Sequence, residues 1–202
     1  MKRTLILSLA VLLAGAVKAQ SVSVKAGLNY SNIIRTGDEN FETEFKPGFH
    51  AGLGIDVPLI DRLALAPEVL FSQKGYKVTG GGLLGDAETT ITTNFIDIPI
   101  LAKINAATGF NIHLGPQISF LTSTTTSFKQ GTQEYRDKVK EDNTNLKKNL
   151  IGGVVGAGFD LSPKLNLHAR YGIDFKKNNE NGTSETPEYK NQVIQLGLGI
   201  KL

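Results

Sequence analysis

The connections between strand-like segments alternate in length along this chain, and this alternation restricts the possible folds more than any other feature. Eight strand-like segments follow residue 20, with long polar connections at residues 31–44, 76–90, 123–149 and 177–188. Short turns fall between them at residues 58–62, 105–108 and 162–164. An up-and-down barrel has this pattern when the loops of one rim are long and the turns of the other are short. We therefore predict an all-β, eight-stranded, antiparallel up-and-down barrel.

The first 19 residues have the features of a secretory signal peptide. Lys2 and Arg3 precede an apolar run over residues 5–17, and small residues lead to a predicted cleavage after Ala19. A permanent membrane anchor is the alternative, but the run is shorter than the roughly 20 residues that a spanning helix needs. We therefore predict a signal peptide at residues 1–19 and a single barrel domain at residues 20–202.

Charge and cysteine content exclude several classes of function. Removal of Lys2, Arg3 and Lys18 with the signal peptide leaves 19 of the 22 basic residues, which equals the 19 acidic residues. A neutral chain without a basic stripe gives no electrostatic case for binding nucleic acid. The absence of cysteine excludes disulfides, iron–sulfur clusters and thiolate zinc sites.

All eight segments alternate with a period of two, which indicates strands with two different environments on their faces. In the first segment Val22, Val24 and Leu28 share one face, and Lys25 and Asn29 lie on the other. The polar faces of all segments together carry ionisable and amide groups, namely Lys25, Asn29, His50, Asp56, Glu68, Asp97, Lys103, His113, Gln117, His168, Arg170, Asp174, Gln195 and Lys201. One wall of the barrel is therefore expected to be apolar and the other polar.

The two walls can be arranged in two ways. A transmembrane barrel turns its apolar wall toward lipid, whereas a soluble barrel of the lipocalin kind encloses it around an apolar ligand. The unequal loop lengths favour the membrane arrangement. So do the aromatic residues near the strand ends beside the long loops, which are Tyr30, Phe45, Phe71, Phe120 and Phe175. We predict a transmembrane barrel with a polar interior.

An eight-stranded barrel is narrow enough for side chains to fill, so buried charges must pair. Counting from the short turns places Lys25, Glu68, Asp97 and Arg170 near mid-height, and we predict an ion-pair network anchored by Glu68 and Arg170. A structural role for this network is favoured over a proton or ion pathway. His113 and His168 are expected at similar heights, but two histidines without a carboxylate are weak zinc ligands, so we predict no metal and no cofactor.

Six segments resemble the PorT-like family of small outer-membrane β-barrels. They are KAGLNYS at 25–31, PGFHAG at 47–52, PEVLFSQKG at 67–75, DIPILAK at 97–103, GPQISFL at 115–121 and QVIQLGLG at 192–199. The resemblance spans nearly the whole mature chain and implies an eight-stranded barrel in the outer membrane of a bacterium with two membranes. It also implies a link to protein secretion, and it carries over no catalytic residue.

The longest predicted loop, residues 123–149, is the candidate interaction region, with Tyr135, Arg136, Lys138 and Lys147 as its candidate contact residues. We predict a non-enzymatic, monomeric barrel whose partners are outer-membrane lipid and an envelope or secretion-system protein. The alternative is a small transporter or ligand-binding barrel for an apolar or ionic solute. An envelope enzyme would need a nucleophile and base at a rim, and no histidine lies in a long loop.

Overall fold

The computed structural model describes residues 21–35, 42–82, 85–130, 133–140, 149–177 and 188–202, which form nine strands and lie outside the predicted signal peptide. The strands are β1 (Ser21–Arg35), β2 (Glu44–Ile60), β3 (Leu63–Gly82), β4 (Gly85–Ala107), β5 (Phe110–Gln130), β6 (Gln133–Lys140), β7 (Asn149–Asp160), β8 (Leu165–Asp174) and β9 (Tyr189–Lys201). No helix in these ranges is long and apolar enough to cross a membrane.

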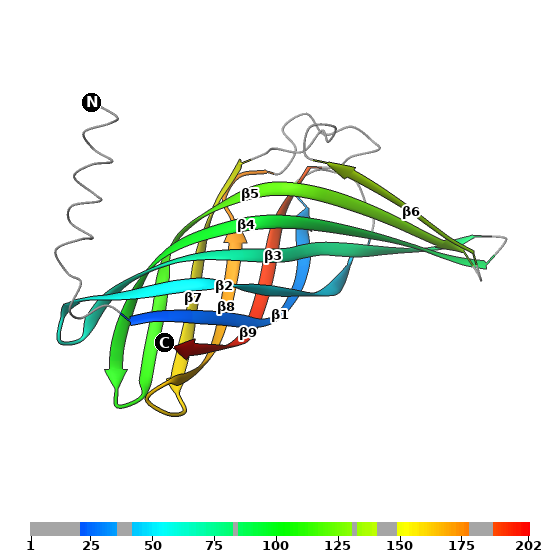
Figure 1. The fold of residues 1–202 in the computed structure, drawn as a ribbon. Helices are drawn as coiled ribbons and strands as arrows, with labels where there is room; N and C mark the ends of the chain where they lie inside the picture. Colours follow the sequence, from blue (N-terminus) through cyan, green and yellow to red (C-terminus); the bar gives the residue numbers. More distant parts are fainter. Residues whose placement is uncertain (1–20, 36–41, 83–84, 131–132, 141–148, 178–187) are drawn as a thin grey trace.

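Eight of the strands close into a ring. Each strand pairs antiparallel with its neighbours, β4 pairs with β5, and β1 pairs with β9, so the circular order is β1-β2-β3-β4-β5-β7-β8-β9. Short turns join β2 to β3, β4 to β5 and β7 to β8 at one rim (Figure 1), where the sequence predicts them. The predicted eight-stranded up-and-down barrel is confirmed. The ninth strand, β6, pairs with the outer half of β5.

Two of the predicted long connections are wrong, because most of their residues continue the sheet. Residues 76–82 and 85–90 form the outer ends of β3 and β4, which pair up to Gly82 and Gly85. Residues 123–130 are the outer part of β5, and residues 133–140 are the strand β6. These segments form a four-stranded sheet that projects beyond the other strands (Figure 1), and we call residues 72–82, 85–94, 123–130 and 133–140 the outer extension.

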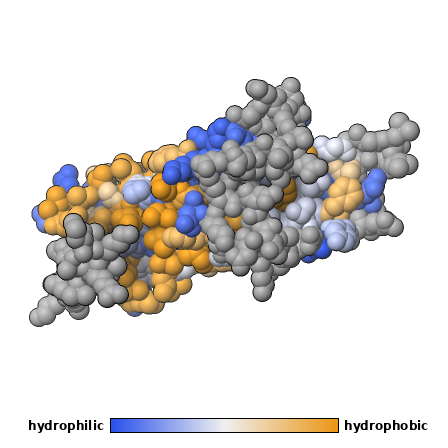
Figure 2. Space-filling view, turned by 90° about the horizontal axis from the view of Figure 1, so that it is seen from above, coloured by the Kyte–Doolittle hydropathy of each residue, from blue (hydrophilic) through white to orange (hydrophobic). Residues whose placement is uncertain are grey.

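The apolar wall faces outward. Leu28 is 69% exposed and Leu196 is 53% exposed, and similar exposure is found around the ring at Leu53, Val69, Leu114, Val155 and Leu198. Figure 2 shows apolar side chains gathered over the barrel and mainly polar ones over the described part of the outer extension. The soluble arrangement, with the apolar stripes enclosed, does not occur.

The outer boundary of the apolar wall is sharp on β3, β4 and β5. Phe71, Ile96 and Phe120 lie side by side on the outward face, and the next outward row consists of Gln73, Asn94 and Ser123. Asn94 donates a hydrogen bond to Ser123 Oγ over 3.0 Å. On the neighbouring strands the rings of Tyr30 and Phe45 stack with centroids 4.8 Å apart. The aromatic residues therefore mark this boundary, as expected of an interfacial girdle.

The interior is mixed rather than wholly polar. Buried polar and charged residues fill most of its height, but two small apolar clusters lie among them. One cluster is Ala66, Leu101 and Val154, and the other, near the outer boundary, is Phe95, Leu121 and Leu150. The alternation does not predict that these residues point inward, because it assigns apolar side chains to the outward face.

Candidate functional site

The centre of the interior is an ion-pair cluster around Glu68. Arg170 donates to Glu68 through both terminal nitrogens, over 2.7 Å from Nη1 and 2.8 Å from Nη2, and Lys25 donates to the same carboxylate. Glu68 is 2% exposed and Arg170 is 4% exposed. The bidentate geometry is the strong form of a charge-assisted pair, and the carboxylate is fully compensated.

The cluster spans the barrel. Glu68 lies on β3 and Arg170 on β8, and each way around the ring three strands separate β3 from β8. The pair therefore bridges opposite sides of the wall. Glycines provide the room: a Cβ at Gly156 would lie 2.7 Å from Arg170 Cγ, and one at Gly54 would lie 3.1 Å from Lys25 Cε.

Asp97 does not join this cluster. It forms a separate pair with Lys74, whose Nζ lies 2.9 Å from Asp97 Oδ2 and 4.9 Å from the centre of the Phe95 ring. The sequence analysis did not count Lys74 among the inward residues, because the apolar stripe that defines the third strand ends at Phe71. Glu68 and Lys74 are an even number of positions apart on β3, so the alternation, once continued, predicts that Lys74 points inward.

The histidines pair differently from the prediction. Nε2 of His50 and Nε2 of His168 lie 3.3 Å apart, and His50 Nδ1 donates to Asn29 Oδ1 over 2.8 Å. His113 instead contacts Asn111 and accepts a hydrogen bond from Arg170 Nε over 3.3 Å. In the described part of the chain, no group of three or more residues of the types that ligate metals comes together. The histidines therefore serve as buried hydrogen-bonding groups.

Gly27 and Gly197 face each other beneath the His50 and His168 rings. A Cβ at Gly27 would lie 2.3 Å from the Leu196 carbonyl oxygen, 2.4 Å from Gly197 Cα and 2.7 Å from His50 Cε1. We expect Gly27→Ala to lower the free energy of unfolding by about 1–3 kcal/mol, as overpacking does. Urea unfolding of the refolded barrel measures this, and Gly80→Ala, where a Cβ meets nothing within 4 Å, is the control. Equal stability of the two variants would contradict the tight packing.

The candidate interaction residues lie on the outer extension. Tyr135 and Arg136 are exposed on β6, Lys138 lies on the same strand, and Lys147 lies outside the described residues. Phe128 on β5 pairs with Tyr135 across the sheet, and their side chains are 41% and 71% exposed. An exposed cross-strand aromatic pair outside the apolar wall is the most prominent surface feature of this extension.

The two faces of the outer extension differ in character. The face that continues the barrel interior carries Tyr76 and Ile91, which belong to a cluster with Ile33, Tyr189 and Val78. Burial raises the pKa of Tyr76 to about 12, so its hydroxyl stays neutral. The opposite face carries Lys77, which pairs with Glu88 over 3.2 Å and lowers the pKa of that carboxyl.

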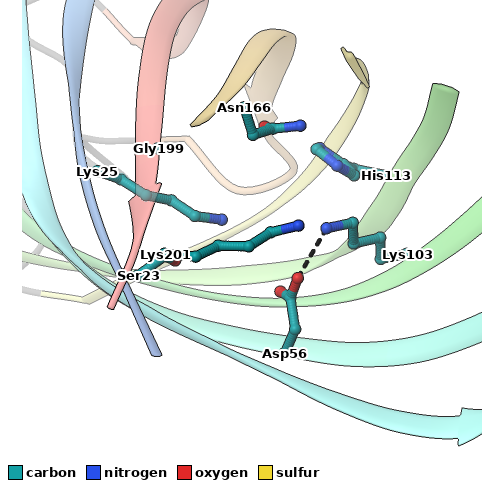
Figure 3. A pocket seen from close by; sticks show the side chains of 8 residues that line it. All are labelled: Ser23, Lys25, Asp56, Lys103, His113, Asn166, Gly199 and Lys201. Carbon is teal, nitrogen blue, oxygen red and sulfur yellow. Dashed lines mark hydrogen bonds and ion pairs between the residues drawn. The ribbon is translucent and has the colours of Figure 1, made fainter. Parts of the chain in front are cut away.

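A hollow opens at the short-turn rim, between the Glu68 cluster and solvent. It is lined by Ser23, Lys25, Asp56, Lys103, His113, Asn166, Gly199 and Lys201. Figure 3 shows the side chains of Lys25, Lys103 and Lys201 pointing toward a common space, with Lys103 Nζ bonded to Asp56 over 2.7 Å. The short-turn end of the interior is therefore rich in ammonium groups.

Two outer-membrane barrels of known structure are similar to this chain over nearly its whole length. The structure of neisserial surface protein A (NspA) is 15% identical, covers 92% of this chain and 100% of that chain, and superposes with a TM-score of 0.53. The attachment invasion locus protein Ail of Yersinia pestis is 14% identical, covers 90% of this chain and 98% of that chain, and gives a TM-score of 0.48. No curated protein matches the chain.

A family model described as an outer membrane protein beta-barrel domain matches residues 18–175, which include Lys25, Glu68 and Arg170. The match covers most of the chain and agrees with the closed ring and the outward apolar wall. The similarity to NspA, at this identity, supports the barrel fold alone. The chain therefore belongs to the outer-membrane protein β-barrel domain family and is an integral protein of the outer membrane.

Proposed function

We propose that this protein is a non-enzymatic, monomeric barrel of the PorT-like kind, which uses its outer extension to bind another envelope protein, as an accessory to protein secretion. The observation that carries this proposal is the exposed pair of Phe128 and Tyr135, which lies beyond the boundary marked by Phe71 and Phe120. Aromatic side chains there gain nothing from lipid, and exposed aromatic residues are typical of protein interfaces.

The interior supports a structural role for the barrel. The Glu68–Arg170 pair joins opposite walls, and Lys74 and Asp97 form a second buried pair nearer the outer boundary. Groups held in such pairs stabilise the ring and fill its cross-section. A transporter would need this bridge to open, and the described interior contains no observation that favours such a movement over a fixed structural core.

Site-specific photo-crosslinking in cells tests the proposed surface. Adjacent residues of a strand point to opposite faces, so a photoreactive amino acid at Phe128 probes the aromatic face and one at Lys129 probes the other face. We expect one protein of defined mass to be captured from position 128, and much less of it from position 129. In addition, Tyr135→Ala is expected to reduce the capture from position 128. Equal capture from positions 128 and 129, or no adduct from 128, would contradict the proposal.

A further inference from the structure

The outward apolar wall is not smooth, because a groove crosses β5, β7 and β8. Its volume is about 500 Å³, which is within the size range of small-molecule sites. The lining is almost entirely apolar and comes mainly from Leu114, Pro116, Gly153, Val155, Tyr171 and Phe175. A site of this size on the outside of the barrel is separate from the packed interior.

The groove exists because Gly153 occupies an outward position. On either side of it along β7, Ile151 and Val155 are exposed on the apolar wall. Gly153 pairs with Pro116 on β5 and with Ile173 on β8. The missing side chain therefore leaves a gap in the middle of an otherwise continuous outward row.

Two aromatic rings of β8 and its outer end form walls of the groove. The ring of Phe175 lies over the gap, since a Cβ at Gly153 would be 2.7 Å from Phe175 Cζ. Tyr171 donates a hydrogen bond to Gln192 Oε1 over 3.1 Å, which holds its ring in place and satisfies its hydroxyl within the apolar wall. The groove runs from Leu114, in the middle of the wall on β5, to Phe175 at the outer end of β8.

The groove is continuous with the wall that faces lipid, so hydrocarbon is the material that fills it. A chain that moves from lipid to protein gains no hydrophobic free energy, and close packing of atoms supplies the attraction instead. A concave groove contacts a chain on several sides, whereas a flat wall contacts it on one, and each added contact contributes dispersion energy. An acyl chain is therefore held more firmly over Gly153 than elsewhere on the wall.

A cation lies just beyond the outer end of the groove. Lys190 is the next outward residue after Gln192 on β9, and Gln192 pairs with Ile173 of the groove. The long loops of such a barrel face the cell exterior, so Lys190 lies toward the outer leaflet. Basic side chains at a membrane surface attract the phosphate headgroups of anionic lipids.

We propose that this groove is a lipid-binding site, which holds one acyl chain of an anionic, phosphate-bearing lipid of the outer leaflet. The chain lies over Gly153 between the rings of Tyr171 and Phe175 and reaches toward Leu114, and the headgroup lies beside Lys190. The site is on the barrel wall and does not depend on the function proposed for the outer extension.

Quenching of tryptophan fluorescence by brominated lipid tests this site, because the chain has no tryptophan of its own. Ile112→Trp places a reporter at the inner end of the groove, beside Leu114 on the outward face of β5. Leu53→Trp places one on the outward face of β2, which three strands separate from β7 in each direction. The barrels are refolded into phosphatidylcholine vesicles that contain a small fraction of brominated phosphatidylglycerol. We expect about fivefold stronger quenching at residue 112 than at residue 53, the enrichment that one lysine gives to an anionic lipid.

Three variants, each combined with Ile112→Trp, separate the groove from a general attraction of lipid. Gly153→Leu fills the groove and should remove the enrichment, as should Lys190→Gln, which removes the cation. Ala26→Leu adds nearly the same bulk to the outward face of β1, where Ala26 is exposed, and should leave the enrichment unchanged. Heat-modified mobility on gels checks that each variant refolds.

Three outcomes would overturn the proposal. Equal quenching at residues 112 and 53 would show that the groove contacts only bulk lipid. Weaker quenching at residue 112 would show that protein, such as a second copy of this chain, covers the groove. Equal enrichment in Gly153→Leu and Ala26→Leu would show that the groove does not hold the chain. If Gly153→Leu does not refold, Phe175→Ala takes its place: it removes one wall of the groove and should lower the enrichment, and an unchanged value would contradict the site.

Discussion

Arg170→Leu is expected to lower the free energy of unfolding by about 3–5 kcal/mol, the usual cost of removing one partner from a buried ion pair. The variant leaves the Glu68 carboxylate, which is 2% exposed, with Lys25 as its remaining cation. It also removes the hydrogen bond that His113 accepts from Arg170 Nε. Urea titration of the refolded barrel in detergent micelles measures the change.

Two companion variants separate the ion pair from general effects of substitution. Lys176→Leu removes an exposed cation just beyond β8 and should change stability by less than about 0.5 kcal/mol. Glu68→Gln combined with Arg170→Leu should cost less than the sum of the two single changes, because both act on one interaction. Strict additivity, or a stable Arg170→Leu barrel, would show that the pair does not support the ring.

Leu196→Arg is expected to destabilise the barrel by about 2–4 kcal/mol in a lipid bilayer, the cost of a cation near the middle of a lipid-facing wall. Leu196 lies beside Leu28 on the outward face and is 53% exposed, so the change removes little protein packing. The penalty comes from lipid and not from lost contacts. Urea unfolding of the barrel in phospholipid vesicles gives its size.

The same change outside the apolar wall provides the control. Thr126 is exposed on the outer extension, and Thr126→Arg should have almost no effect on stability in vesicles. If Leu196→Arg were equally harmless, the wall around Leu196 would be in contact with water, as in a soluble protein.

The barrel itself could be predicted from the sequence because each strand meets lipid on one face and the packed interior on the other. The two environments impose a period of two on residues such as Val22, Val24 and Leu28. The short turns were placed at the right positions for the same reason, since the alternation ends before Pro58 and resumes at Leu63, although β2 itself continues to Ile60. The Glu68–Arg170 contact follows once both residues point into a narrow lumen.

The outer extension could not be predicted from this pattern. Beyond Phe71 and Phe120 the outward face meets water, so it no longer needs apolar residues and the alternation disappears while the strands continue. Thr92 and Thr93 on β4 pair with Thr125 and Thr124 on β5. Threonine is favoured in strands, and this run of threonines was the available signal that residues 85–94 and 123–130 are not loops.

The contacts across the lumen were predicted only in part. The stagger between strands determines which inward side chains lie at the same height and can contact each other. The sequence analysis ignored shear and placed His113 beside His168, whereas the structure places His50 beside it. Shear is a property of the closed ring and cannot be read from one strand. For the same reason the convergence of Lys25, Lys103 and Lys201 becomes visible only in the folded barrel.

The most direct test of the central claim is to measure, residue by residue along β9, whether each side chain contacts lipid or water. The chain has no cysteine, so single cysteines at residues 194, 195, 196 and 198 can carry spin labels, and collisions with oxygen and with a water-soluble nickel complex report lipid and water contact. In vesicles, labels at Ile194, Leu196 and Leu198 should collide with oxygen and not with nickel, and a label at Gln195 with neither. Nickel access at Leu196, or the same oxygen access at all four positions, would contradict an apolar wall that faces lipid.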